Sequence, residues 1–299
     1  MPRRSSAFVP LLLLLLAPLA AEAMELGPPA RGLATFREND AGYMSLGFSS
    51  ERIDMKEYDH YTYSPSGVQE VERQVTYASF AWLPHDRVEM DLRLGIQGMK
   101  VGNAIEVDGR VLDGDSRMSG FAGGGLRVLA YENPDAGFRL GWLVDGSVTV
   151  LRWKKQKDRF QDADDNAVVA DLWYGEYVEA RMALPLAKVF RLSPRVEMDT
   201  LGPRGVPPRG AVDWPFPKFT ALEIYGGPFV RAAFMYGDAS ATVGSQDLGH
   251  SRFYLFQDTV AGAFAGMRAY AGEAQRWSIG LEGRYQSELS VSFLVDTSL

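Results

Sequence analysis

Residues 87–97 read RVEMDLRLGIQ and alternate strictly between polar or glycine and apolar positions. In an extended strand, one face would carry the apolar side chains of Val88, Met90, Leu92, Leu94 and Ile96. A strand of this kind separates an apolar surface from a polar one. Because the pattern recurs along most of a chain that opens with an export signal, the sequence predicts a transmembrane, antiparallel, up-and-down β-barrel.

The N-terminus has the features of a secretory signal peptide. Arg3 and Arg4 precede a leucine-rich apolar stretch, and small residues flank a cleavage site at Ala23. That stretch is too short to cross a bilayer as a helix. We therefore expect a signal peptide over 1–23, a periplasmic leader over 24–41 and a barrel over 42–299 in the outer membrane of a Gram-negative bacterium.

Composition excludes several classes of protein. The chain has no cysteine, so it can form neither a disulfide framework nor a lipid-anchored lipoprotein. It has 31 basic and 38 acidic residues, a formal charge of -7 and no basic tract for nucleic acid. Acidic residues cluster within 108–115 and 158–166, but their spacing does not match a calcium-binding EF-hand loop. No metal site or cofactor is predicted.

The N-terminal strands follow from the same alternation. A first strand is expected to begin near Gly42, and a second is expected over 69–83. In the second strand, the apolar phase changes between Tyr77 and Phe80, which predicts a β-bulge.

Two turns are predicted in the second half of the chain, and the second of them decides the expected number of strands. One is predicted at 185–188, joining a strand over 171–184 to another over 189–201, and the second at Gly226-Gly227-Pro228. A break at the second turn keeps short connections on the periplasmic side and favours twelve strands. A single strand across 219–236 gives the alternative of ten strands.

Near the C-terminus, residues 276–285 read RWSIGLEGRY and resemble the penultimate strand of small outer-membrane barrels of the OmpA-like and porin-like kind. The resemblance implies assembly from the periplasm by the barrel-assembly machinery, with outer-membrane lipid and lipopolysaccharide as partners. The chain departs from such barrels at its end. They commonly finish in an aromatic residue, whereas this sequence finishes in Leu299.

Alternation also places charged residues inside the predicted barrel, since a charge facing lipid costs about 2–4 kcal/mol near the midplane. The candidates for a lumen constriction are Asp91, Arg93, Arg139, Asp145, Glu179, Arg181, Arg191, Arg195, Glu197, Asp199, Glu282 and Arg284. Four further charged residues are also expected inside: Glu89, Arg127, Glu223 and Arg231. Acids and bases are balanced, so they can either pair and close the interior or line a narrow polar channel.

The leading functional expectation is a non-enzymatic, passive pore for small polar solutes. The alternative is a structural or binding barrel that is closed by its own ion pairs and whose loops contact lipopolysaccharide or a partner. A third hypothesis is an outer-membrane hydrolase, in which Asp59 orients His60 in the first external loop. No group of residues in the sequence indicates a nucleophile for such an enzyme, and no oligomeric state is predicted.

Overall fold

The computed structural model describes residues 42–58, 65–107, 110–153, 156–161, 167–192, 219–243, 246–271, 277–286 and 289–298. In these segments, all the strand pairs are antiparallel, which confirms the predicted all-β, antiparallel class. Within the same segments, no helix is long and apolar enough to cross a membrane.

The strands vary widely in length. Their bounds are β1 Gly42–Tyr58, β2 Pro65–His85, β3 Val88–Val107, β4 Arg110–Arg117, β5 Ser119–Asn133, β6 Phe138–Trp153, β7 Gln156–Gln161, β8 Ala167–Ala183, β9 Leu186–Arg191, β10 Phe219–Val243, β11 Gln246–Gln257, β12 Ala261–Ala271, β13 Trp277–Tyr285 and β14 Leu289–Ser298. Together they make one sheet of 14 strands.

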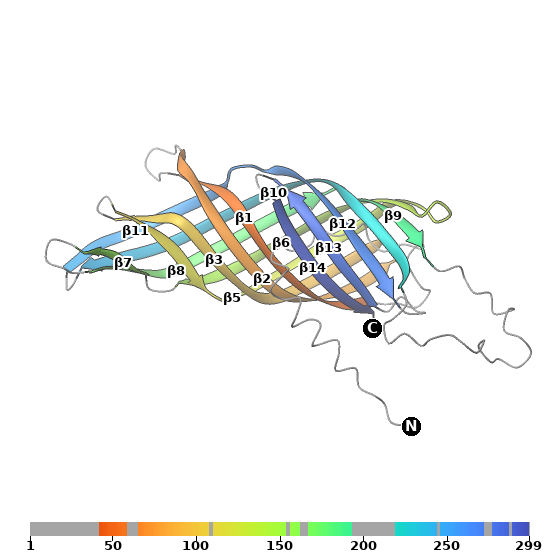
Figure 1. The fold of residues 1–299 in the computed structure, drawn as a ribbon, viewed down its shortest axis with the longest axis horizontal. Coiled ribbons are helices and arrows are strands. Elements are labelled where there is room, and N and C mark those ends of the chain that lie inside the picture. Colours follow the sequence, from red (N-terminus) through yellow and green to blue (C-terminus); the bar gives the residue numbers. More distant parts are fainter. Residues whose placement is uncertain are drawn as a thin grey trace, which may run out of the picture.

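The sheet closes on itself. Pairing runs in the order β1, β2, β3, β5, β6, β8, β10, β12, β13 and β14, and β14 then pairs with β1. Figure 1 shows the resulting cylinder of tilted strands. Tyr43 pairs with Ser298, so the first strand begins and the last strand ends at one end of the cylinder. We call this the terminal end and the opposite one the distal end.

Each of the four remaining strands continues the line of one strand of this circuit. β4 continues β5 along β3, and β7 continues β6 along β8. β9 continues β8 along β10, and β11 continues β12 along the other side of β10. Among the described residues, the circuit therefore contains ten strands. This is the number predicted from the sequence as the alternative to twelve.

Neither the turn predicted at 185–188 nor the turn predicted at Gly226-Gly227-Pro228 is present. The chain keeps its direction from β8 through Leu184 and Pro185 into β9, and both strands pair with β10. β10 passes without a break through Gly226, Gly227 and Pro228. Both prolines lie inside paired regions. The Pro185 carbonyl accepts a hydrogen bond from the Gly141 amide at 3.0 Å, and the Pro228 carbonyl accepts one from the Leu184 amide at 3.1 Å. Each proline removes a single donor from the ladder, and the remaining bonds carry both strands past it.

The predicted bulge between Tyr77 and Phe80 is also absent, because the pairing of β2 with β1 is regular there. Val75 and Tyr77 instead point into the cylinder, where Tyr77 packs edge-on against Phe121 with ring centroids 6.3 Å apart. The interior thus takes apolar side chains as well as charges. With no bulge to change the phase, Arg73 also faces inward.

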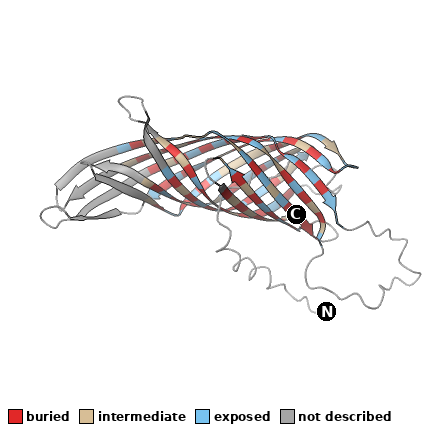
Figure 2. Ribbon diagram, turned by 45° about the horizontal axis from the view of Figure 1, so that its top comes forward, coloured by how far each residue is buried: buried red, intermediate tan, exposed pale blue. Residues whose placement is uncertain are grey.

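The cylinder is apolar outside and charged inside. Leu46 and Leu94 are 58% and 57% exposed, whereas Arg73 and Glu223 are fully buried. Buried residues alternate with exposed or partly exposed ones along most of the strands whose burial is described (Figure 2). A water-soluble domain has the reverse arrangement, since it buries leucine and exposes arginine.

Candidate functional site

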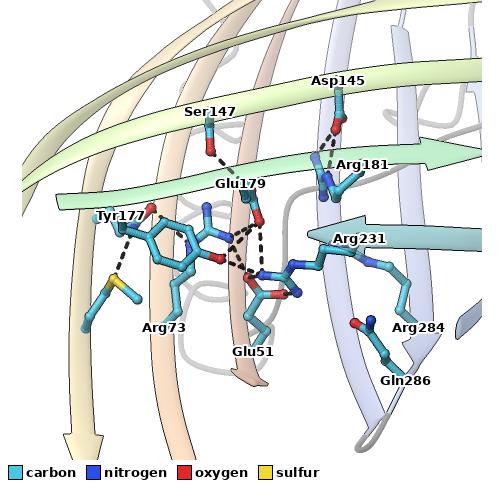
Figure 3. Close-up of polar contacts among 12 residues, drawn as sticks. Glu51, Arg73, Asp145, Ser147, Tyr177, Glu179, Arg181, Arg231, Arg284 and Gln286 are labelled. Atoms are coloured by element: carbon cyan, nitrogen blue, oxygen red, sulfur yellow. Dashed lines mark hydrogen bonds and ion pairs between the residues drawn. The ribbon is translucent and has the colours of Figure 1, made fainter. Parts of the chain in front are cut away.

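The interior of the cylinder is the candidate functional site, and its centre is a cluster that we call the central network: Glu51, Arg73, Tyr177, Glu179 and Arg231 (Figure 3). The Arg73 Nη1 atom lies 2.6 Å from Glu51 Oε1 and 2.9 Å from Glu179 Oε2. Arg231 binds both oxygens of Glu51, at 2.7 and 2.8 Å. Its Nη2 atom also lies 3.0 Å from Glu179 Oε2. Each carboxylate is thus held by both arginines.

The hydroxyl of Tyr177 completes the central network. It accepts a hydrogen bond from Arg231 at 2.9 Å and donates one to Glu179 at 3.2 Å. The guanidinium carbon of Arg73 lies 4.8 Å from the centre of the Tyr177 ring, within the range of a cation–π contact. Ser147 donates to the other oxygen of Glu179 at 3.1 Å.

These contacts join opposite walls of the cylinder. Arg73 comes from β2 and Glu179 from β8, and β3, β5 and β6 lie between those strands along the circuit. Glu51 on β1 and Arg231 on β10 are likewise on well-separated walls. The ion pairs therefore cross the interior instead of running along its surface.

A second cluster lies next to the central network, with Asp145 at its centre. Arg181 binds both oxygens of Asp145 at 2.7 Å, and Arg93 Nη1 lies 2.9 Å from Asp145 Oδ2. Arg93 also contacts Asp91, two residues away on the same strand, at 2.5 Å. Fork-shaped contacts of this kind are among the stronger polar interactions in proteins.

Three smaller groups occupy the terminal end. Arg127 Nη1 lies 2.6 Å from Glu89, whose carboxylate also accepts the Tyr43 hydroxyl at 2.5 Å. Arg139 Nη1 lies 2.5 Å from Glu223, which accepts the Tyr270 hydroxyl at 2.6 Å. In the third group, Asp296 lies 3.1 Å from Arg268 and accepts a hydrogen bond from Ser278 at 2.6 Å. Charged groups are therefore paired along much of the axis.

A small cavity lies beside the Asp145 and Arg127 clusters. It has a volume of about 10 Å³ and is lined by Tyr43, Ser45, Tyr77, Ser79, Asp91, Arg93, Arg127 and Leu294. This volume holds about one water molecule. The side chains of Arg73 and Glu179 are 0% exposed and that of Glu51 is 2% exposed, so the central network is buried.

The predicted constriction residues divide into three sets. The structure brings eight of them into the interior: Asp91, Arg93, Arg139, Asp145, Glu179, Arg181, Glu282 and Arg284. Arg191 has the inward phase but is exposed, because β9 ends at this residue. Arg195, Glu197 and Asp199 lie outside the described residues. The constriction was expected to set Arg191, Arg195 and Arg93 against Glu197, Asp199 and Asp91. Of these six residues, only Arg93 and Asp91 meet in the described interior.

Several members of the site were not predicted from the sequence, namely Glu51, Arg73, Tyr177, Arg268 and Asp296. Two of them were within reach of the same reasoning. Continuing the alternation of the first strand past Ser49 places Glu51 inside. Omitting the bulge in the second strand does the same for Arg73.

The histidines and acidic residues outside these clusters are the remaining candidates for catalytic or metal-binding groups. His60 lies outside the described residues. His85 is exposed at the end of β2, where its Nδ1 atom accepts a hydrogen bond from the Arg87 amide at 3.2 Å. In the part of the chain that the structure describes, no group of three or more His, Cys, Asp or Glu side chains could hold a metal ion. The organised polar chemistry lies in the ion pairs of the interior.

No protein-family model matches the chain, and no curated protein matches its sequence. Solved structures of low similarity include the translocator domain of the autotransporter NalP from Neisseria meningitidis, with 9% identity over 88% of this chain and 90% of that chain and a TM-score of 0.37. The outer-membrane protease OmpT from Escherichia coli is 8% identical over 87% of this chain and 95% of that chain, with a TM-score of 0.41. The fold of this chain is defined by the strand pairing described above.

Proposed function

We propose that this chain is a transmembrane β-barrel of the outer membrane of a Gram-negative bacterium. In this proposal the interior is closed by ion pairs, and the protein acts as a structural or binding protein and not as an open pore. It is non-enzymatic and enters the membrane from the periplasm through the barrel-assembly machinery. The observation that carries the proposal is the central network, in which buried charges join opposite walls of a cylinder whose outer surface is apolar.

The outer surface supports the membrane assignment. Outward side chains along β6 are apolar or glycine from Phe138 to Val150, and Arg152 follows. This stretch measures about 40 Å along the strand at about 3.3 Å per residue. At the tilt of about 45° that is common in membrane barrels, its height is about 28 Å, close to the apolar band of about 25 Å in such proteins.

The interior favours a closed barrel over the passive pore expected from the sequence. A pore needs a continuous path of water, whereas Arg73, Glu179 and Arg231 fill the centre with their charges directly paired. Separating these pairs without admitting water would leave buried, uncompensated charges, at a cost of several kcal/mol for each ion. The pairs therefore act as a plug in this arrangement.

The lengths of the strands indicate where a binding function would reside. β10 has 25 residues and β2 has 21, whereas a tilted strand crosses a membrane in about 9–11 residues. Both strands therefore continue beyond the bilayer at the distal end. We propose that this extension presents the external loops to lipopolysaccharide or to a protein partner.

Conductance measurements test the closed interior. The refolded full chain is expected to shift in gel mobility on heating, as folded barrels do, and to give no current steps in a planar bilayer at high salt. Replacing Glu51, Arg73, Glu179 and Arg231 together by alanine removes the plug and is expected to produce steps. Steps of wild-type protein that are equal to those of this variant would reject the closed barrel.

A further inference from the structure

Carboxylates neutralise two exposed arginines of the described residues near the distal end. Arg52 on β1 lies 3.2 Å from both Glu70 and Glu72 on β2. Arg252 on β11 lies 3.5 Å from Asp238 on β10. Such exposed pairs balance the charge of the rim locally.

Arg117 and Arg152 break this pattern. They are direct cross-strand partners on β4 and β6, and both are exposed. Neither guanidinium makes an ion pair or hydrogen bond with any residue that the structure describes. Two like charges directly opposite each other destabilise a sheet, so an anion between them would relieve a repulsion that the fold itself leaves in place.

A third cation adjoins this pair. Lys100 on β3 is exposed and points outward next to β4, where Asp115 is its cross-strand partner. Glu176 on β8 borders the group on the other side and faces Val150. Three basic and two acidic side chains leave a net positive charge, which is concentrated at Arg117 and Arg152. Neighbouring strands are about 4.8 Å apart, so one tetrahedral anion can contact both guanidiniums.

The position of the basic group specifies the anion. Immediately toward the terminal end, the outer surface is apolar: Val148 is 48%, Val150 50%, Ile96 48% and Met118 51% exposed. The basic group therefore lies where the apolar belt ends. In a membrane, a lipid places its phosphate at this level and its acyl chains against the belt below.

We propose that Arg117 and Arg152, assisted by Lys100, bind a phosphate of the lipid A part of lipopolysaccharide, with an acyl chain packed over Val148, Val150 and Met118. This inference rests on the proposed outer-membrane location and names the lipid contact that the location would use. Arginine suits the role because its planar fork can donate two hydrogen bonds to one phosphate. The ligand is a lipid held by charge and apolar contact together.

The test is a titration of the refolded full chain with lipid A in a zwitterionic detergent. The variant Arg117→Gln/Arg152→Gln is expected to bind lipid A about tenfold more weakly, the equivalent of one charge-assisted hydrogen bond. The matched control Arg52→Gln also removes an outward arginine, but one that Glu70 and Glu72 already neutralise. It is expected to bind as wild type does. Phosphate-free lipid A is expected to bind wild type and double variant equally weakly.

Three outcomes would overturn the inference: equal affinity of wild type and double variant, an equal loss in Arg52→Gln, or displacement of lipid A by excess inorganic phosphate. The last would identify free phosphate as the ligand. Heat-dependent gel mobility and vesicle insertion are measured on the same samples. Failure of wild type to insert contradicts the proposed membrane location, whereas correct insertion with unchanged affinity contradicts only the lipid site. If the double variant does not fold, the single variant Arg152→Gln is tested instead. Its affinity for lipid A is expected to fall about threefold, and an unchanged affinity would overturn the inference.

Discussion

Arg73 on β2 reaches across the interior to Glu179 on β8, with its Nη1 atom 2.9 Å from the carboxylate. The two residues are 106 positions apart in the sequence, and both side chains are 0% exposed. Arg73 also contacts Glu51 on the neighbouring strand β1. A single guanidinium thus links three strands across the interior of the cylinder.

Replacing Arg73 should destabilise the protein strongly. Arg73→Met leaves Glu51 and Glu179 with Arg231 as their shared cation, and removing one partner of a buried ion pair costs about 3–5 kcal/mol. Urea unfolding of the chain in lipid vesicles measures the loss. Arg52→Met serves as the control, because the Arg52 side chain is 53% exposed and its ion pairs are worth about 0–1 kcal/mol. Equal effects of the two substitutions would contradict a closed central network.

A charge on the outer surface should discriminate a membrane protein from a soluble one. Leu94 is 57% exposed in the middle of the apolar belt. Leu94→Arg is expected to lower the free energy of unfolding in vesicles by about 2–4 kcal/mol, because the guanidinium would face hydrocarbon.

Gln74→Arg provides the matched control for the lipid-facing charge. Gln74 is also exposed on the outer face, but nearer the distal end, where Glu72 is the next residue on the same face. The cost there should be about 0–1 kcal/mol. If Leu94→Arg is tolerated as well as Gln74→Arg, the apolar belt does not face lipid.

The interior is also packed tightly around glycine. Tyr77 is the cross-strand partner of Gly47, and a Cβ atom on Gly47 would overlap the Tyr77 ring. Gly47→Ala is expected to cost about 1–3 kcal/mol by overpacking, measured by the same unfolding assay. Gly120→Ala is the control, since no heavy atom lies within 4 Å of the added Cβ, and its effect should stay within about 0.5 kcal/mol. A smaller side chain in Gly47→Ala/Tyr77→Leu should recover part of the loss, whereas a loose interior would tolerate Gly47→Ala alone.

The hydrolase hypothesis makes a separate prediction. The refolded chain is expected to cleave neither peptides nor lipid A, and His60→Ala is expected to change nothing in either assay. Products are followed by mass spectrometry over a long incubation. Cleavage by wild type that is lost in His60→Ala would replace the non-enzymatic proposal with an outer-membrane hydrolase.

The alternation of side chains could be read from the sequence because it is local. The two-residue repeat of a strand is enough to predict that Leu94 lies on an apolar face and that Asp91 and Arg93 lie on a polar one. The same repeat placed Asp145, Glu179 and Arg181 correctly within their own strands. The all-β, antiparallel class follows from nothing more.

The continuity of the strands could not be read in this way. Pro185 and Gly226-Gly227-Pro228 are strong local turn signals, yet the strands pass through both sites because neighbouring strands supply the remaining hydrogen bonds. Those bonds come from β6, β8 and β10, so they exist only once the strands lie side by side. The sequence therefore favoured twelve strands, and tertiary pairing gave ten in the described circuit.

The partners of the buried charges were also decided by tertiary structure. The sequence alone determined that Arg93, Arg181 and Glu179 face inward, since direction depends on a strand's own phase. Which charge meets which depends on register and on the closure of the circuit. These bring Arg73 to Glu179 and Arg231 to Glu51 across the interior. An alternating strand is equally compatible with an open channel or a plug, and only the distance between opposite walls, set by the number of strands around the cylinder, lets these side chains meet.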